Sequence, residues 1–306
     1  MPIVISHEEV KHTRTSRMRE DGKSTARTDF IVPPADNLTS PQAFLSEQSS
    51  FRHLRTHFHH NDQFQIFVEG GGTNARHVIQ PFQVHFTRKH TPYGPINANE
   101  LGCKFLTLRR QKDPGAQYLP ENREKLESFE LRNPWQVTGK VAFPEVGSGV
   151  KRRPVDGVHD ENGLDAQAIT MEPNAKGFGP DASTSSGQYI AVLGGSLIYE
   201  GKEYGAISLV WLDAAEGAFL LQAGAQGLNA VALNFPQKLV APASPPDKPH
   251  GELKVWQCVL CAFVYDEVAG MPEEGIPPGT RWEDVPDTFG CPDCSASKAD
   301  FEMIEI

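Results

Sequence analysis

The sequence predicts a mainly β protein, made of two β-rich stretches and a small separate unit at the C-terminus. Three observations lead to this fold class. Short apolar runs alternate with glycine- and proline-rich turns over residues 44–110 and again over 135–236. A segment with five prolines follows at 236–251. Four of the five cysteines then lie in the last 49 residues.

The domain boundaries follow from these changes in composition. We expect a first β-barrel with an N-terminal arm over residues 1–134, including a short helix within 120–132, and a second β-barrel over 135–236. Residues 237–252 are expected to form an extended linker, because they contain almost nothing that can build a core. Residues 253–306 then form the separate C-terminal unit.

The negative charge of the chain is concentrated in the C-terminal unit. From Gly251 to the end there are twelve acids and three bases, a net charge of −9, whereas the whole 306-residue chain carries −10. Phosphates would repel such an acidic end, which argues against nucleic acid and favours a basic protein partner. The longest apolar runs are far shorter than the roughly 20 residues that span a bilayer, and the N-terminus lacks a signal-peptide core. We therefore expect no membrane partner and a cytoplasmic location.

The four C-terminal cysteines form two closely spaced pairs. Cys258 and Cys261 are separated by two residues, as are Cys291 and Cys294, and 29 residues lie between the pairs. In a reducing cytoplasm, four clustered thiols indicate a metal site and not two disulfides. Four thiolates in a tetrahedron suit iron or zinc, and the spacing alone leaves both open.

The residues between the cysteine pairs resemble those of the rubredoxin family. The match includes Tyr265-Asp266, "GIPPGT" at 275–280 and "VPDTFGCPDC" at 285–294. This resemblance implies one iron held by the four cysteines, which moves one electron between Fe(II) and Fe(III). Ala262 and Ser295 depart from the family pattern, because each replaces a glycine at a position that needs a glycine-like conformation.

The rubredoxin resemblance also implies a small core and a partner. The partner is a rubredoxin reductase or a similar electron-transfer protein with a basic face. The alternative is a structural zinc ion that holds a unit of about 50 residues together. The residues implied for the aromatic core are Trp256, Tyr265, Trp282, Phe289 and Phe301.

Histidines are concentrated in the first β-rich stretch, where seven of the eleven fall between residues 53 and 90. His57 and His59 are two positions apart, so in an extended strand they share a face, while His60 points the other way. Two such imidazoles supply half of a site for iron, copper, manganese, nickel or zinc. For any single histidine, a hydrogen-bonded structural role is the simpler interpretation.

The spacing His57-x-His59-x3-Gln63-x6-Gly70 resembles the first motif of the cupin family of small β-barrels. The segment "TPYGP" at 91–95 resembles the second motif, with Tyr93 at a ligand position. The resemblance implies a metal, iron, copper or manganese, held by His57, His59, Gln63 and Tyr93. Three other histidines are candidates to replace a missing ligand: His77, His85 and His90.

The second β-rich stretch resembles a cupin barrel in its strand and turn layout only, and no histidine occurs between His159 and His250. We therefore expect a bicupin-like double barrel whose second half holds no metal. One hypothesis is an oxidoreductase, in which the rubredoxin-like unit feeds electrons to a metal-dependent oxygenase site acting on a small-molecule substrate. The alternative is a non-catalytic electron carrier or a redox-responsive small-molecule-binding protein. The sequence identifies neither the substrate nor a catalytic residue, and it is compatible with a homodimer.

Overall fold

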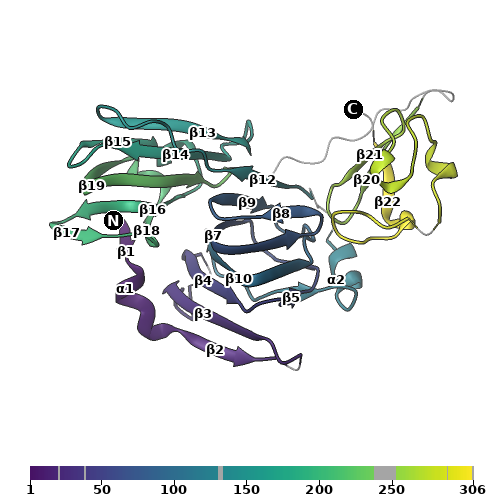
Figure 1. Ribbon diagram of the computed structural model, residues 1–306, viewed down its shortest axis with the longest axis horizontal. Helices are drawn as coiled ribbons and strands as arrows, with labels where there is room; N and C mark the ends of the chain where they lie inside the picture. Colours follow the sequence, from purple (N-terminus) through teal and green to yellow (C-terminus); the bar gives the residue numbers. More distant parts are fainter. Residues whose placement is uncertain (20, 38, 130–133, 238–252, 288, 305–306) are drawn as a thin grey trace.

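The computed structural model describes residues 1–19, 21–37, 39–129, 134–237, 253–287 and 289–304. Three bodies lie in a row, with the second barrel at one end, the first barrel in the middle and the C-terminal unit at the other end (Figure 1). From residue 238 onward, the predicted linker lies outside the described residues. Among the described helices, none is long and apolar enough to cross a membrane.

The first barrel is built on a nine-stranded antiparallel sheet with the central order β12-β9-β7-β10-β4-β3-β2; β5 pairs with β10 and β8 with β7. A short ribbon of β6 and β11 lies outside this sheet. The helix predicted within 120–132 is confirmed as α2 (Arg123–Glu127). The strands are β2 (Thr15–Met18), β3 (Ser24–Ile31), β4 (Gln42–Gln48), β5 (His53–Leu54), β6 (His57–Phe58), β7 (Gln63–Asn74), β8 (His77–Ile79), β9 (Gln83–Thr87), β10 (Ile96–Arg109), β11 (Gln117–Tyr118) and β12 (Gln136–Lys140).

The second barrel is an eight-stranded antiparallel sheet with the central order β1-β18-β16-β19-β14-β13. The N-terminal strand is followed by helix α1 (His7–Val10), whose first turn is capped by Ser6. The strands are β1 (Ile3–Ile5), β13 (Val150–His159), β14 (Asp165–Met171), β15 (Lys176–Asp181), β16 (Gln188–Tyr199), β17 (Lys202–Tyr204), β18 (Ser208–Leu212) and β19 (Ala218–Asn234).

Two strands lie in a different barrel from the one that the sequence predicted. β1 belongs to the second barrel, because it pairs with β18, although residues 1–134 were expected to form the first. β12 pairs with β9 and therefore belongs to the first barrel, although it begins after residue 135. Each strand hydrogen-bonds to an exposed sheet edge of its new neighbour, which satisfies backbone groups that would otherwise remain unpaired. The exchange also ties the two barrels together.

Successive side chains of β7 point in turn into a shared apolar core and into the inside of the first barrel. Phe64 and Ile66 pack into a core that both barrels share, where the ring of Phe64 meets that of Phe235 from the end of β19 at 5.0 Å. Gln63 and Gln65 point to the opposite face, inside the first barrel, as expected for residues two positions apart in a strand. Both faces of this part of the strand are therefore buried, one of them apolar and the other carrying the two glutamines.

The interiors of the two barrels differ in polarity. The interior of the second barrel holds a continuous apolar cluster that includes Ile169, Ile190, Val210 and Leu221. The first barrel has a smaller apolar cluster around Phe67 and keeps polar side chains beside it. The described cavity that reaches the histidines therefore lies in the first barrel.

The C-terminal unit contains a three-stranded antiparallel sheet of β20 (Val255–Cys258), β21 (Val264–Asp266) and β22 (Phe301–Ile304). The aromatic core expected from the sequence is present. The rings of Trp256 and Trp282 stack with centroids 5.4 Å apart, and Trp282 also contacts Tyr265, Phe289 and Phe301.

The two glycine replacements in this unit adopt the conformation that the sequence predicted. Ala262 has a φ of 67° and Ser295 a φ of 59°, both in the left-handed region. The backbone N–H of each residue donates to the carbonyl four positions earlier, of Cys258 and Cys291 respectively. These bonds close each cysteine knuckle, so the knuckles tolerate a side chain there at some conformational cost.

The shared core between the barrels predicts a large stability effect. Phe235 is 1% exposed, and Phe235→Ala should lower the free energy of unfolding by about 3–5 kcal/mol, because a cavity replaces the ring. Phe178→Ala is the matched control, since Phe178 is 64% exposed and should cost less than about 1 kcal/mol. Urea unfolding of the full chain measures both, and equal losses would contradict a shared core.

Candidate metal centre and adjoining cavity

The four cysteines of the C-terminal unit converge on one point. The Sγ atoms of Cys258 and Cys294 are 3.7 Å apart, and those of Cys261 and Cys291 are 3.5 Å apart. All four sulfurs lie within 4.8 Å of one another, all are buried, and none forms a disulfide. A tetrahedron with metal–sulfur bonds of about 2.3 Å has edges of about 3.8 Å. The sulfur spacing therefore fits a single tetrahedral metal ion.

The burial of this cluster also fits a metal ion, because all four sulfurs are buried. Several thiolates cannot be buried together without a compensating charge, so four buried thiolates need a cation at their centre. The four residues that the sequence predicted as ligands are thus together in a site that suits iron.

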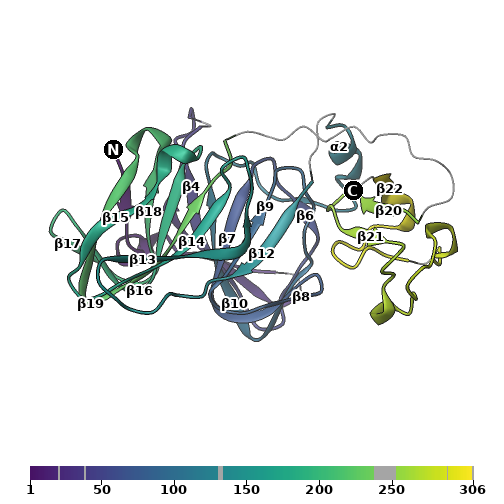
Figure 2. The ribbon, with the colours of Figure 1, turned by 90° about the horizontal axis from the view of Figure 1, so that it is seen from above.

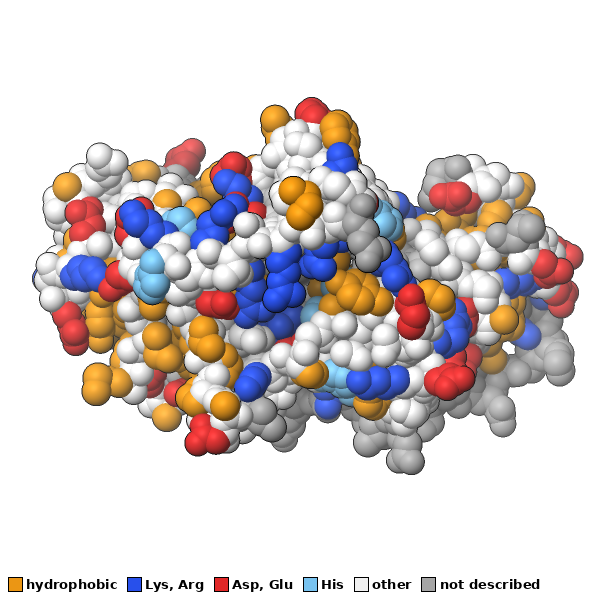
Figure 3. Space-filling view, turned by 90° about the horizontal axis from the view of Figure 1, so that it is seen from below, with side chains coloured by type: hydrophobic (Ala, Val, Ile, Leu, Met, Phe, Trp, Pro, Cys, Tyr) orange, Lys and Arg blue, Asp and Glu red, His pale blue; other side chains and the backbone are white. Residues whose placement is uncertain are grey.

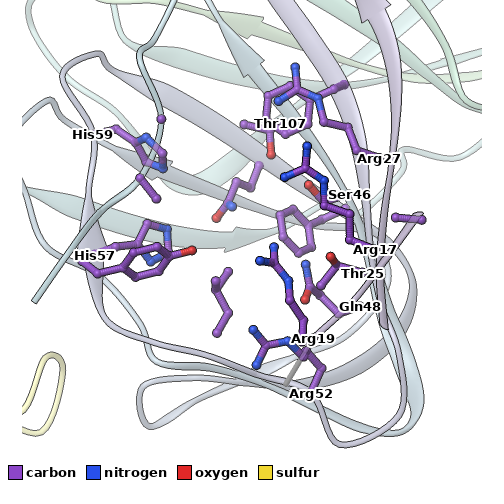
Figure 4. Close-up of a pocket in the computed structure, with 18 of the residues that line it drawn as sticks. Arg17, Arg19, Thr25, Arg27, Ser46, Gln48, Arg52, His57, His59 and Thr107 are labelled. Atoms are coloured by element: carbon purple, nitrogen blue, oxygen red, sulfur yellow. The ribbon is translucent and has the colours of Figure 1, made fainter. Parts of the chain in front are cut away.

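A separate cavity of about 350 Å³ opens into the first barrel. Basic side chains border the hollow on one side in the space-filling view, and a histidine is visible inside it (Figure 3). His57 and His59 form one wall, opposite Arg17 of β2 and Arg27 of β3 (Figure 4). The arginines that line it are Arg17, Arg19, Arg27, Arg52 and Arg109.

His57 is held by a hydrogen-bonded chain along the cavity wall. Its Nδ1 donates to the carbonyl of Arg55 at 2.7 Å, which leaves Nε2 as an acceptor for the hydroxyl of Tyr93 at 2.9 Å. The Gln63 amide then donates to the Tyr93 oxygen at 2.6 Å. His57 and Tyr93 are also joined through their backbones, which fixes their separation.

His59 belongs to a second, charged chain in the same wall. Its Nδ1 donates to Asp113 at 2.8 Å, and Nη2 of Arg109 lies 3.2 Å from both ring nitrogens. Arg109 also donates to the oxygen of Gln63, at 2.8 Å from Nη2 and 3.1 Å from Nε. Burial opposes the charge of Asp113, but the hydrogen bond from His59 and the guanidinium of Arg109 keep its pKa below the usual value.

The side chains predicted as ligands of a second metal are together, but their donor set does not fit a divalent cation. The Nε2 atoms of His57 and His59 already face the Tyr93 hydroxyl and Arg109, and the Gln63 oxygen accepts from the same guanidinium. Burial raises the pKa of Tyr93, which keeps the phenol protonated. A buried cation, Arg109, therefore stands among the atoms that a metal would need.

The side chains of the three alternative histidines have other partners. His85 is buried and bonds Thr87 and Thr138, at 2.8 Å each. His77 is half exposed and lies 3.3 Å from Asp293 of the C-terminal unit. His90 stacks on the ring of Phe129, with centroids 3.6 Å apart.

Sequence reasoning missed Arg109 and Asp113 as parts of the site. Both lie about 50 positions after the histidines, and their contact depends on the pairing of β10 with β7. The sequence did indicate the arginines at the cavity mouth through their spacing. Arg17 and Arg19 are two positions apart on the segment that contains β2, so an extended strand presents both on one face.

β6 lies between the cavity and the cysteine cluster. His57 and His59 face the cavity, whereas Phe58 is fully buried in the apolar cluster that contains all four metal-binding cysteines. Leu126 of α2 belongs to the same cluster. Both ribbon views place β6 or α2 directly beside the C-terminal unit (Figures 1 and 2). One short strand therefore separates the cavity from the packing around the cysteines.

Ion pairs surround this apolar contact. Asp293, next to Cys294, lies 3.2 Å from Arg76 of the turn between β7 and β8, and Arg123 of α2 pairs with Asp300. The guanidinium of Arg76 also lies over the ring of Phe263, 5.0 Å from its centroid. The first barrel thus presents basic side chains to acidic side chains of the C-terminal unit.

Comparison with known proteins identifies the C-terminal unit. The family model described as rubredoxin matches residues 255–301. Rubredoxin-2 of Pseudomonas aeruginosa is 65% identical over 54 residues, which cover 18% of this chain and 98% of the relative. Rubredoxin of Acinetobacter baylyi is 57% identical over 54 residues, which cover 18% of this chain and 100% of the relative.

The rest of the chain resembles cupin proteins in fold. A candidate dioxygenase from Nostoc punctiforme has a TM-score of 0.52 and 12% identity, covering 81% of this chain and 88% of that one. A variant of Bacillus subtilis oxalate decarboxylase has a TM-score of 0.51 and 13% identity, covering 76% of each chain. At such low identity the similarity establishes the fold alone.

The fold and the four-cysteine site define an electron-transfer domain with one iron, fused to a cupin-like body. Through its C-terminal unit, the chain belongs to the rubredoxin family.

The buried histidines of the first barrel predict a loss of stability in acid. Burial lowers the pKa of His57 to about 3, and that of His59 and His85 to about 4. Exposed histidines in the unfolded chain have a pKa of about 6.5, so unfolding takes up protons between about pH 6.5 and 4. Stability should therefore fall as the pH falls through this window, by up to about 1.4 kcal/mol per pH unit for each histidine.

His85→Gln tests this assignment, because it removes one of the three groups and keeps a polar side chain beside Thr87 and Thr138. Urea unfolding at several pH values gives the free energy of unfolding as a function of pH. Near pH 5, the slope of this curve should correspond to about one proton fewer taken up on unfolding in the variant. An unchanged slope would show that His85 is protonated equally in the folded and unfolded chain.

Proposed function

We propose that this chain is a redox-responsive small-molecule-binding protein, in which the oxidation state of the four-cysteine site and the occupancy of the first-barrel cavity influence each other. One observation supports this most strongly. β6 has the cavity on one face, through His57 and His59, and the cluster around the metal-binding cysteines on the other, through Phe58. A charge placed in the cavity therefore lies across β6 from the apolar cluster that contains the cysteines.

The iron that fits this site supplies a reversible one-electron change between Fe(III) and Fe(II) when bound. The residues of the chain set how easily that change occurs. The four cysteines hold the ion, and Phe58 and Leu126 exclude water from the side that faces the barrel. Arg109 places a buried positive charge in the cavity wall.

The direction of the coupling follows from charge. Reduction adds one negative charge to the four-cysteine site. Positive charges in the cavity favour the reduced state, and an anion bound there opposes it. Because linkage is reciprocal, reduction should weaken the binding of an anion by the same free energy.

This function differs from that of a metal-dependent oxygenase, the other function that the sequence suggested. That function requires a second metal at His57, His59, Gln63 and Tyr93, where the hydrogen-bonded network around Arg109 supports a metal-free binding site instead. The same cavity still provides the place for a small molecule.

The proposal keeps an external electron-transfer partner. Asp293 and Asp300 are engaged by the first barrel, but Glu274, Glu283 and Asp284 of the C-terminal unit are exposed. We propose that these acids dock a reductase with a basic face, by electrostatic steering.

The coupling predicts a change in midpoint potential without any ligand. Arg52→Gln removes one positive charge from the cavity wall and should lower the potential of the iron-loaded full chain by roughly 10–30 mV, a Coulomb effect of a few tenths of a kcal/mol. Lys176→Gln is the matched control. It removes an exposed positive charge from β15, on the second barrel, and should shift the potential less.

A double-mutant cycle tests whether the contact carries this effect. Leu126→Gln is neutral and places a polar group in the apolar contact, so water should reach the cysteine cluster and raise the potential. In the Leu126→Gln protein, the change in midpoint potential caused by Arg52→Gln should be no larger than the change caused by Lys176→Gln. Equal shifts for the two charge removals in the unmodified chain would contradict the proposed coupling.

A further inference from the structure

The described residues that line the first-barrel cavity include five arginines and neither aspartate nor glutamate. Three of the arginines already have acidic partners outside the cavity lining. Arg27 pairs with Asp29 at 2.6 Å and Arg52 with Asp21 at 3.1 Å. Arg109 lies 3.7 Å from Asp113. Arg17 and Arg19 are exposed at the mouth, and the structure shows no acidic partner for either within the described part of the chain. The cavity therefore carries an excess of positive charge.

Polar atoms in the cavity lining lack partners. The Nε of Arg52 and the Oε1 atoms of Gln48 and Gln65 are buried without a hydrogen bond, and all three residues line the cavity. A buried polar atom without a partner costs free energy, so these positions are suited to a ligand that satisfies them. The Arg52 donor suits an oxygen of an anion, and the two glutamine acceptors suit hydroxyl groups.

The remaining lining is also suited to a polar guest. Thr25, Ser46 and Thr107 contribute hydroxyls, shown around the arginines in Figure 4. A volume of about 350 Å³ holds roughly twelve non-hydrogen atoms at the spacing of liquid water, about 30 Å³ each. This is the size of a small organic molecule and far below that of a macromolecule or a dinucleotide.

We infer that the cavity binds a small organic anion rich in hydroxyl groups, with its carboxylate or phosphate toward the arginines and its hydroxyls toward Gln48 and Gln65. This inference names the ligand class for the cavity used in the proposed function. It does not depend on the redox coupling, because the charges and the unpaired atoms belong to the cavity itself.

Isothermal titration calorimetry on the oxidised, iron-loaded full chain tests the inference with three probes of similar skeleton. D-gluconate carries a carboxylate, D-glucose 6-phosphate carries a phosphate, and D-glucose is neutral. At least one anion should bind at least tenfold more tightly than glucose, and its affinity should fall as the salt concentration rises. Tighter binding of gluconate assigns the anionic group to a carboxylate, and tighter binding of glucose 6-phosphate assigns it to a phosphate.

Variants connect this binding to the arginines. Arg52→Gln should weaken binding of the anion about tenfold or more, and so should Arg17→Gln, which lies at the exposed mouth where folding is not at risk. Arg152→Gln on β13 of the second barrel is the matched control and should leave binding unchanged. Glucose that binds as tightly as both anions, no binding of either anion, or no loss in either cavity variant would overturn the inference.

The two proposals fail in different ways. Anion binding by calorimetry without a change in midpoint potential on Arg52→Gln would preserve the ligand class and reject the coupling. A shifted potential without anion binding would preserve the coupling and reject the ligand class.

Discussion

The arrangement of the two sites depends on the two-residue strand β6. Its alternation places Phe58 in the apolar contact with the C-terminal unit and the two neighbouring histidines in the cavity. Strand geometry alone produces this division, because successive side chains point to opposite faces. The ion pair of Asp293 with Arg76 lies beside this contact and complements it. The cavity and the packing around the cysteines thus lie on opposite faces of one short strand.

The second constraint is the buried charge of Arg109. In the four-cysteine site, buried sulfurs converge and need a cation from outside the chain. In the first barrel, the chain supplies its own cation, which bridges the oxygen of Gln63 and the ring of His59 beside Asp113. A buried guanidinium is stable only with such partners around it. Both sites therefore contain buried polar groups that a cation stabilises. In the four-cysteine site this cation comes from outside the chain, and in the first barrel it is Arg109.

The sequence predicted local features well and long-range pairing poorly. The cysteine site could be predicted because its ligands and turns lie within one short segment, down to the left-handed conformations of Ala262 and Ser295. The shared face of His57 and His59 followed from strand periodicity. The membership of β1 and β12 could not be predicted, because it depends on which sheet edge each strand meets. The role of Arg109 was hidden for the same reason, since 46 positions separate it from Gln63.

The most direct test of the central claim is the affinity of one anion for the two oxidation states of the same protein. Calorimetry with D-gluconate or D-glucose 6-phosphate, whichever binds more tightly, would be repeated on the full chain after reduction of the iron. We expect weaker binding to the reduced protein, and this difference in affinity should disappear in Leu126→Gln, where the apolar contact beside β6 is disturbed. Equal affinity for the oxidised and reduced protein would contradict coupling across β6.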